Sequence, residues 1–187
     1  MPKIKIVKDE LVYEGKYLAL VKRHYRGTRG KSAVWETIER VSHDRIVAIA
    51  PVTAKNEIIL TKIYRIPQKK YVIELCTGLK DKPRESDEEA VRRELLEETG
   101  YAVKKVERLL SGPSNPGLIN DRIAIYLGTG AVRTSRQKIE NSEDISVLKT
   151  PLSTVMNFLA HPPKNVLVDI KIYAVLFFLK QEGYKIG

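Results

Sequence analysis

Three glutamates stand close together in the sequence, at positions 94, 97 and 98. On an α-helix, which turns by about 100° per residue, their side chains share an arc of roughly 100° and are neighbours in space. Like charges at these spacings destabilise a helix by about 0.2–0.5 kcal/mol per pair. A divalent cation would offset this repulsion, and carboxylate oxygens suit Mg²⁺ or Mn²⁺. The spacing therefore predicts a metal-binding helix whose ions polarise a phosphate group for attack by water.

The alternative for these glutamates is an ordinary solvated helix face. Its carboxylates would pair with the neighbouring arginines Arg92 and Arg93. Taken alone, a Glu-x-x-Glu-Glu segment favours this alternative, so the surrounding sequence has to decide.

The predicted helix around the glutamates has a defined start and end. Ser86 and Glu89 have the spacing of a capping box, in which each side chain satisfies a free backbone N–H. Acidic residues at positions 87–89 suit the positive end of the helix dipole. Gly100 is a favourable C-terminal stop, and Val91 and Leu95 are expected to face the core. A loop over residues 78–85 precedes this helix.

The remaining elements predict a mixed-sheet α/β or α+β fold, because strands and helices follow one another in mixed order. Two further helices are expected over residues 152–159 and 168–181. A seam near residues 42–44 separates an N-terminal strand section, residues 1–43, from a main domain, residues 44–187. The β-rich segments are residues 17–25, 33–41, 45–52, 57–64, 102–110, 122–128 and 145–148.

The 187 residues carry a formal net charge of +10, which favours anionic partners such as nucleotides. The lysines are scattered and no basic, aromatic-bearing module is visible, so nucleic acid is an unlikely partner. The single cysteine, Cys76, excludes an internal disulfide and indicates a reducing, cytoplasmic setting. The longest apolar-rich run, residues 166–179, contains charges and is too short to span a bilayer.

Residues 78–101 resemble the signature of the Nudix hydrolases. The resemblance rests on Glu85, a gap of seven residues, and then Arg93-Glu94-Leu95-Leu96-Glu97-Glu98-Thr99-Gly100, closed by Tyr101. The six residues between Gly78 and Glu85 are one more than the family pattern has. This departure puts the geometry of the glycine loop and the role of Glu85 in doubt more than the helical glutamates.

Flanking segments resemble the ADP-ribose and ADP-sugar pyrophosphatases within that family. They are Trp35-Glu36-Thr37-Ile38-Glu39-Arg40, Lys62-Ile63-Tyr64-Arg65-Ile66-Pro67, Glu74-Leu75-Cys76-Thr77-Gly78-Leu79, Pro116-Gly117, Ser142-Glu143-Asp144 and Val168-Asp169. Each match is weak by itself, and their order carries the resemblance.

The resemblance implies a set of residues for metal binding and catalysis. The metal ligands are Glu94, Glu97 and Glu98 with the backbone carbonyl of Thr77, and Glu97 is also counted with the catalytic residues. Arg93 would orient the carboxylates, or it forms only a helix surface ion pair. Glu143 would be the general base that activates water, with Glu140 and Asp144 as neighbouring candidates. The alternative for Glu143 is an ordinary loop glutamate.

The resemblance also implies a substrate site. Arg40 and Arg65 would contact phosphate oxygens, because a guanidinium matches two such oxygens at once. Trp35 would stack on the base, with Glu36 hydrogen-bonding to it, or else Trp35 serves packing.

The resemblance therefore predicts a Nudix α/β/α sandwich with an N-terminal β section, assembled as a homodimer. The expected reaction is Mg²⁺- or Mn²⁺-dependent hydrolysis of ADP-ribose, or a related nucleoside diphosphate sugar, to a nucleoside monophosphate and a sugar phosphate. The alternatives are a hydrolase of another sugar nucleotide such as GDP-mannose or UDP-glucose, a dinucleoside polyphosphate or triphosphate hydrolase, and a Nudix domain that only binds a nucleotide.

Overall fold

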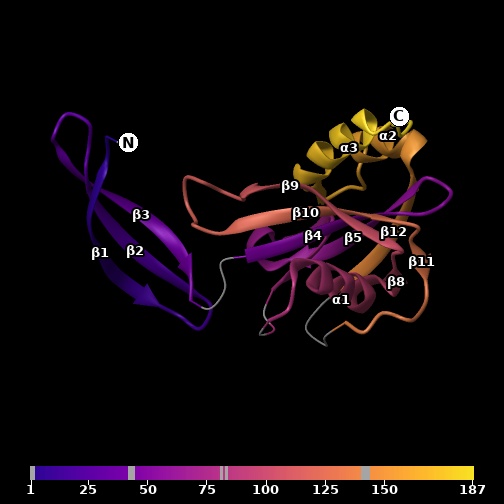
Figure 1. Cartoon of the computed structure of the whole chain (residues 1–187), viewed down its shortest axis with the longest axis horizontal. Helices are drawn as coiled ribbons and strands as arrows, with labels where there is room; N and C mark the ends of the chain where they lie inside the picture. Colours follow the sequence, from indigo (N-terminus) through magenta and orange to yellow (C-terminus); the bar gives the residue numbers. More distant parts are fainter. Residues whose placement is uncertain (1–2, 42–44, 81, 83, 140–143) are drawn as a thin grey trace. The chain divides into compact units, whose positions relative to one another are not determined.

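The computed structural model describes residues 3–41, 45–80, 82, 84–139 and 144–187. The chain divides into two compact units (Figure 1). The smaller unit joins Met1–Ile46 to Gly112–Ile123, and the larger unit joins Val47–Ser111 to Ala124–Gly187. The predicted domain boundary at residues 43 and 44 lies outside the described residues and stays a prediction.

The smaller unit contains an antiparallel three-stranded sheet in the order β1 (Lys5–Glu14), β2 (Leu18–Arg26), β3 (Ser32–Arg40). Every residue of β1 is exposed. Segment 112–123 lies against β3, where the backbone N–H of Ile38 donates to the carbonyl of Leu118 at 2.8 Å. Segment 112–123, from the middle of the chain, is therefore hydrogen-bonded to the three-stranded sheet.

The larger unit is built on an eight-stranded sheet. The eight strands are β4 (Arg45–Val52), β5 (Glu57–Arg65), β6 (Lys70–Glu74), β7 (Cys76–Leu79), β9 (Lys105–Pro113), β10 (Arg122–Thr129), β12 (Ile145–Pro151) and β13 (Val166–Val168). Strand β5 pairs antiparallel with β4, β6 and β12, and β13 pairs parallel with β6, so the sheet is mixed. A separate two-stranded sheet joins β8 (Tyr101–Ala102) to β11 (Val132–Arg133).

Helices cover the two faces of this sheet. Helix α1 (Asp87–Thr99) lies on one side, and α2 (Val155–Ala160) and α3 (Lys171–Gln181) lie on the other (Figure 1). Single 3₁₀ turns stand at Ile66–Gln68 and Leu152–Thr154. The predicted α/β/α arrangement with an N-terminal β section is confirmed. Among the helices of the described residues, none combines the length and the hydropathy that a membrane-spanning segment needs.

Two element predictions were wrong in detail. The last helix begins at Lys171, not at residue 168, because Val166–Val168 forms β13 on the edge of β6. The strand predicted over residues 102–110 is divided between β8 and β9, which belong to different sheets. Both differences come from pairing with strands distant in sequence, which local residue preferences do not reveal.

Candidate active site

Helix α1 starts and ends as the sequence predicts. The backbone N–H of Ser86 donates to the Glu89 carboxylate at 2.7 Å, and the Glu89 N–H donates to the Ser86 hydroxyl at 3.1 Å, which completes the capping box. Gly100 ends the helix in the left-handed region at φ 74°. A Cβ at this glycine would lie 2.3 Å from the Ser135 carbonyl oxygen, so both conformation and space require glycine.

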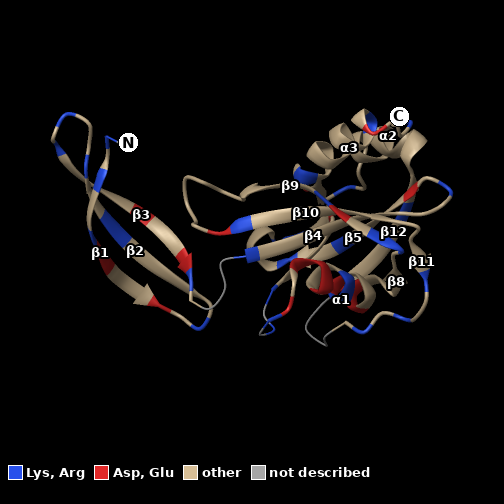
Figure 2. Cartoon of the chain, in the orientation of Figure 1, with Lys and Arg blue, Asp and Glu red and all other residues tan. Residues whose placement is uncertain are grey.

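The apolar side of α1 fixes which way its glutamates face. Ala90, Val91 and Leu95 are buried in one core cluster with side chains of β4, β10 and Cys76. The predicted core positions Val91 and Leu95 are confirmed. The acidic residues are left on the remaining surface of the helix, where Asp and Glu gather (Figure 2).

Arg93 is the centre of the polar contacts on that surface. Its Nε and one terminal nitrogen donate to the two carboxylate oxygens of Glu85 at 2.8 and 3.0 Å. Its other terminal nitrogen donates to Glu94 at 2.8 Å and to Glu97 at 3.4 Å. The hydrogen bond with Arg93 lowers the pKa of Glu85, and the bond to Glu85, followed by that to Glu94, raises the pKa of Arg93. One guanidinium therefore holds three carboxylates in fixed directions.

Glu94 rests directly on the backbone of β7. A Cβ built on Gly78 would lie 2.0 Å from the carboxyl carbon of Glu94, so this approach requires glycine at position 78. Thr77 precedes that glycine, and its hydroxyl donates to the Leu75 carbonyl oxygen at 2.8 Å. Only Gly78 lets the carboxylate lie this close to the strand.

Glu98 interacts with the Cys76 thiol and with the charge of Arg65. Burial, and then the charge of Glu98 and a hydrogen bond with it, raises the pKa of the Cys76 thiol. Glu74, whose side chain is 8% exposed, accepts two hydrogen bonds of 2.7 Å from Arg65. This bidentate pair raises the pKa of Arg65, and Glu98 adds a smaller attraction. Arg65 is thus oriented by Glu74, and the charge of Glu98 attracts it.

In the smaller unit, Trp35 is 52% exposed and its indole N–H donates to the Gly117 carbonyl oxygen at 3.0 Å. A hollow of about 680 Å³ lies beside it. The hollow is lined by Glu10, Lys22, His24, Val34, Trp35, Glu36 and Gly117. Trp35 and Glu36 therefore border one open space.

Arg40 points to a buried carboxylate in the same unit. Its Nε lies 3.4 Å from Oδ2 of Asp121, which is almost wholly buried. The hydroxyl of Ser114 donates to the other oxygen of Asp121. Position 121 carried no signal in the sequence beyond an acidic residue before a strand.

Glu143, the predicted general base, and Glu140 lie outside the described residues. Asp144 is described, and its carboxylate accepts a hydrogen bond from the Tyr71 hydroxyl. Its carbonyl accepts a bond of 3.3 Å from the backbone N–H of Tyr64. These contacts fix the start of β12 next to the position of Glu143 in the chain.

The carboxylates on α1 are the candidate donors for a divalent cation. Among the described residues, no three His, Cys, Asp or Glu side chains converge as a metal site by themselves. Mg²⁺ commonly takes only one or two carboxylates and completes its shell with water and substrate phosphates. Glu94 lies directly against the backbone at Gly78, and its carboxylate is a hard oxygen donor that fits such an ion.

Residues 42–171 match the family model of the NUDIX domain. The chain belongs to the Nudix family. It is 31% identical over 196 residues to the ADP-sugar pyrophosphatase of Mus musculus, covering 96% of this chain and 89% of that protein. It is 26% identical over 153 residues to the ADP-ribose pyrophosphatase of Bacillus subtilis, covering 81% of this chain and 80% of that protein.

A solved structure of an ADP compounds hydrolase matches with a TM-score of 0.81 at 22% identity, covering 97% of this chain and 95% of that chain. A likeness at this identity shows the fold, which is the Nudix fold predicted from the sequence. The Nudix helix α1, the glycine of β7 and the strands around them all lie inside the matched residues.

Sequence reasoning missed three polar contacts made by the predicted site residues. Glu74 pairs with Arg65, Asp121 pairs with Arg40, and the side chain of Gln137 donates to the Glu98 carbonyl oxygen at 2.7 Å. Glu74 is the last residue of β6 and Asp121 directly precedes β10, and neither position carries a signal of a buried charge beyond its acidic residue type. No local signal distinguishes Gln137.

Proposed function

We propose that this Nudix protein hydrolyses the diphosphate bond of ADP-ribose or a related nucleoside diphosphate sugar, giving a nucleoside monophosphate and a sugar phosphate. The observation that carries the proposal is Arg93 holding Glu85, Glu94 and Glu97 while Glu94 rests on Gly78. Such prearranged carboxylates suit a divalent cation that neutralises a diphosphate. The relatives named for ADP-ribose and ADP-sugars support this substrate class.

The proposed ligands of the divalent cation are Glu94, Glu97, Glu98 and the backbone carbonyl of Thr77, and the proposed ion is Mg²⁺ or Mn²⁺. When bound, the cation would neutralise phosphate charge and lower the barrier to attack by water. Arg93 would keep Glu94 and Glu97 turned toward it, because its hydrogen bonds leave these carboxylates few other orientations.

Glu143 remains the proposed general base. In the sequence it directly precedes Asp144, whose carboxylate and carbonyl both accept hydrogen bonds. A carboxylate within reach of the attacking water accepts its proton.

Trp35, Glu36, Arg40 and Arg65 are the proposed substrate contacts. The exposed face of Trp35 suits stacking on a base, and Glu36 borders the same hollow as a hydrogen-bond acceptor. Glu74 holds the Arg65 guanidinium in a fixed direction, and a guanidinium oriented in this way suits binding of a phosphate group.

The proposed assembly is a homodimer. β1 exposes large apolar side chains, and the rest of the described unit leaves them uncovered. A patch of this kind marks an interaction surface, and a second copy would cover it. Sedimentation equilibrium should give twice the chain mass of 21.3 kDa; a monomer at micromolar concentration would contradict the assembly.

Release of AMP from ADP-ribose, with and without Mg²⁺, tests the proposed reaction. We expect turnover that requires the ion and is abolished by a chelator. GDP-mannose and UDP-glucose in the same assay set the base and sugar preference. If the protein binds ADP-ribose but does not hydrolyse it with or without Mg²⁺, the alternative of a Nudix domain that only binds a nucleotide would be favoured.

A further inference from the structure

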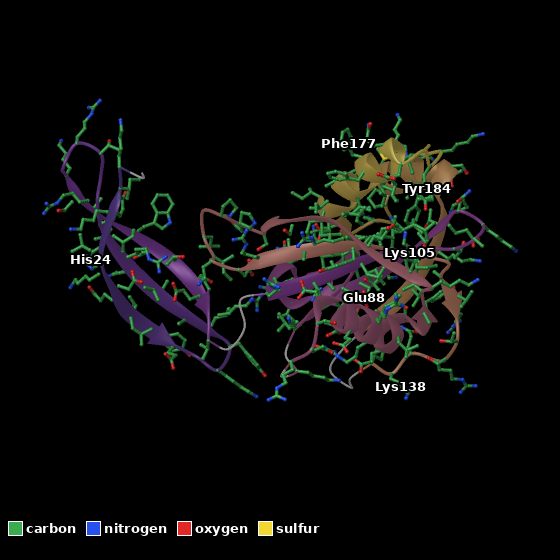
Figure 3. All side chains as sticks on the ribbon, viewed as in Figure 1. His24, Glu88, Lys105, Lys138, Phe177 and Tyr184 are labelled. Atoms are coloured by element: carbon green, nitrogen blue, oxygen red, sulfur yellow. The ribbon has the colours of Figure 1, made fainter. Side chains whose placement is uncertain are left out.

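The C-terminal end of the Nudix helix α1 is covered by one segment, residues 134–138. A helix leaves its last carbonyls without partners inside the helix. Here the Glu97 carbonyl accepts from the Lys138 backbone N–H at 2.8 Å, and the Gly100 carbonyl accepts from Thr134 and Ser135 at 2.9 and 3.2 Å. Lys138 lies on the segment that runs alongside α1 (Figure 3).

The Glu97 and Gly100 carbonyls accept hydrogen bonds from backbone N–H groups, whereas the Glu98 carbonyl accepts one from a side chain. The amide nitrogen of Gln137 donates to the Glu98 carbonyl oxygen at 2.7 Å and to the Ile145 carbonyl oxygen at 3.2 Å. A primary amide has two N–H donors, so these bonds occupy both of them. Ile145 is buried and is the first residue of β12. One side chain therefore ties the last turn of α1 to the start of a central-sheet strand.

We propose that Gln137 is a positioning residue that fixes Glu98 for metal binding. The inference rests on the proposed function. The last turn of a helix frays easily, and Glu98 lies one residue before the end of α1. Without the amide of Gln137, the backbone at Glu98 would lose its connection to β12, and the carboxylate it carries would be less well placed. Neither donor bond touches the carboxylate, so Gln137 acts through the backbone.

The test compares Gln137→Ala with Ser135→Ala. The serine lies in the same segment, and among the described residues its hydroxyl donates only to the neighbouring Arg136 carbonyl, so its loss spares the backbone bonds to α1. Binding of Mn²⁺ is measured without substrate from the spin-resonance signal of the free ion, and kcat and KM are then measured with ADP-ribose. We expect Gln137→Ala to weaken Mn²⁺ binding and lower kcat about tenfold, as loss of a group that orients a ligand does. KM should change little, and Ser135→Ala should match the unchanged protein.

A second variant keeps the test decisive if the alanine protein does not fold. Gln137→Met retains the length of the side chain and removes both donors, so it should show the same loss of Mn²⁺ affinity. Lower thermal stability with unchanged Mn²⁺ affinity and kcat would overturn the proposal. Because Mn²⁺ binding is read without substrate, failure of ADP-ribose hydrolysis in the unchanged protein would reject the proposed function and leave the role of Gln137 testable.

Discussion

The Nudix helix and the N-terminal sheet differ in how far their side chains are paired and buried within the chain. Around α1, Glu85 is 8% exposed, and Glu85, Glu94 and Glu97 all pair with Arg93. In the N-terminal sheet, Tyr13 is 67% exposed and β1 has no buried residue. The proposed metal-binding groups are therefore arranged by contacts within the chain, whereas we expect the sheet to offer a surface for other molecules. Changes near α1 should act on turnover, and changes in the sheet should act on binding.

Glu98→Gln should have the largest effect. It keeps the shape of the side chain and removes the charge, so turnover should fall by about two or more orders of magnitude while the unfolding temperature is unchanged. Glu88→Gln is the matched control, because Glu88 lies on the same helix and pairs with Arg92 at its surface. Equal activity of the two variants would remove Glu98 from the site.

Gly78→Ala tests the close approach of Glu94. The added methyl group would displace the carboxylate, so we expect turnover to fall at least about tenfold. Stability should change little, because the atoms that the methyl group meets belong to the flexible side chain of Glu94. Gly112→Ala is the control, since no atom lies within 4 Å of a Cβ there. Urea denaturation and initial rates measure both quantities. Full activity in Gly78→Ala would mean that Glu94 does not need this position.

Trp35→Ala should act on substrate binding. Loss of base stacking costs about 1–3 kcal/mol, so KM for ADP-ribose should rise about tenfold, with kcat nearly unchanged. Trp35→Phe should restore most of the affinity because it keeps an aromatic face. If the alanine variant unfolds instead, Trp35 serves packing. The expectation that changes in the N-terminal sheet act on substrate binding would then be contradicted.

The smallest effect is expected in the pH dependence of stability. Arg93 holds the pKa of Glu85 below its ordinary value of 4.5. The pair therefore stabilises the folded state fully above pH 4.5, and this contribution is lost as the pH falls through the lower, folded-state pKa. The stability difference from Glu85→Gln, measured by urea denaturation, should be constant above pH 5 and shrink toward pH 3. A difference independent of pH would exclude the ion pair as its source.

The sequence predicted what depends on local spacing. Ser86, Glu89 and Gly100 defined the helix, and its period separated Val91 and Leu95 from the glutamates. What it could not predict depends on distant pairing. Val166–Val168 became a strand because β6 lies beside it, and Gln137 meets Glu98 only because the chain returns to α1. The role of Glu143 stays a prediction, since its position lies outside the described residues.

Binding of divalent cations by the acidic face of α1 is tested most directly by Mn²⁺ titration of the unchanged protein against a Glu94→Gln/Glu98→Gln double variant. The two proteins should unfold at similar temperatures. We predict saturable binding at millimolar Mn²⁺ or below in the unchanged protein and its loss in the double variant. Equal binding by both proteins, or binding by neither, would contradict the assignment of this face as the metal site.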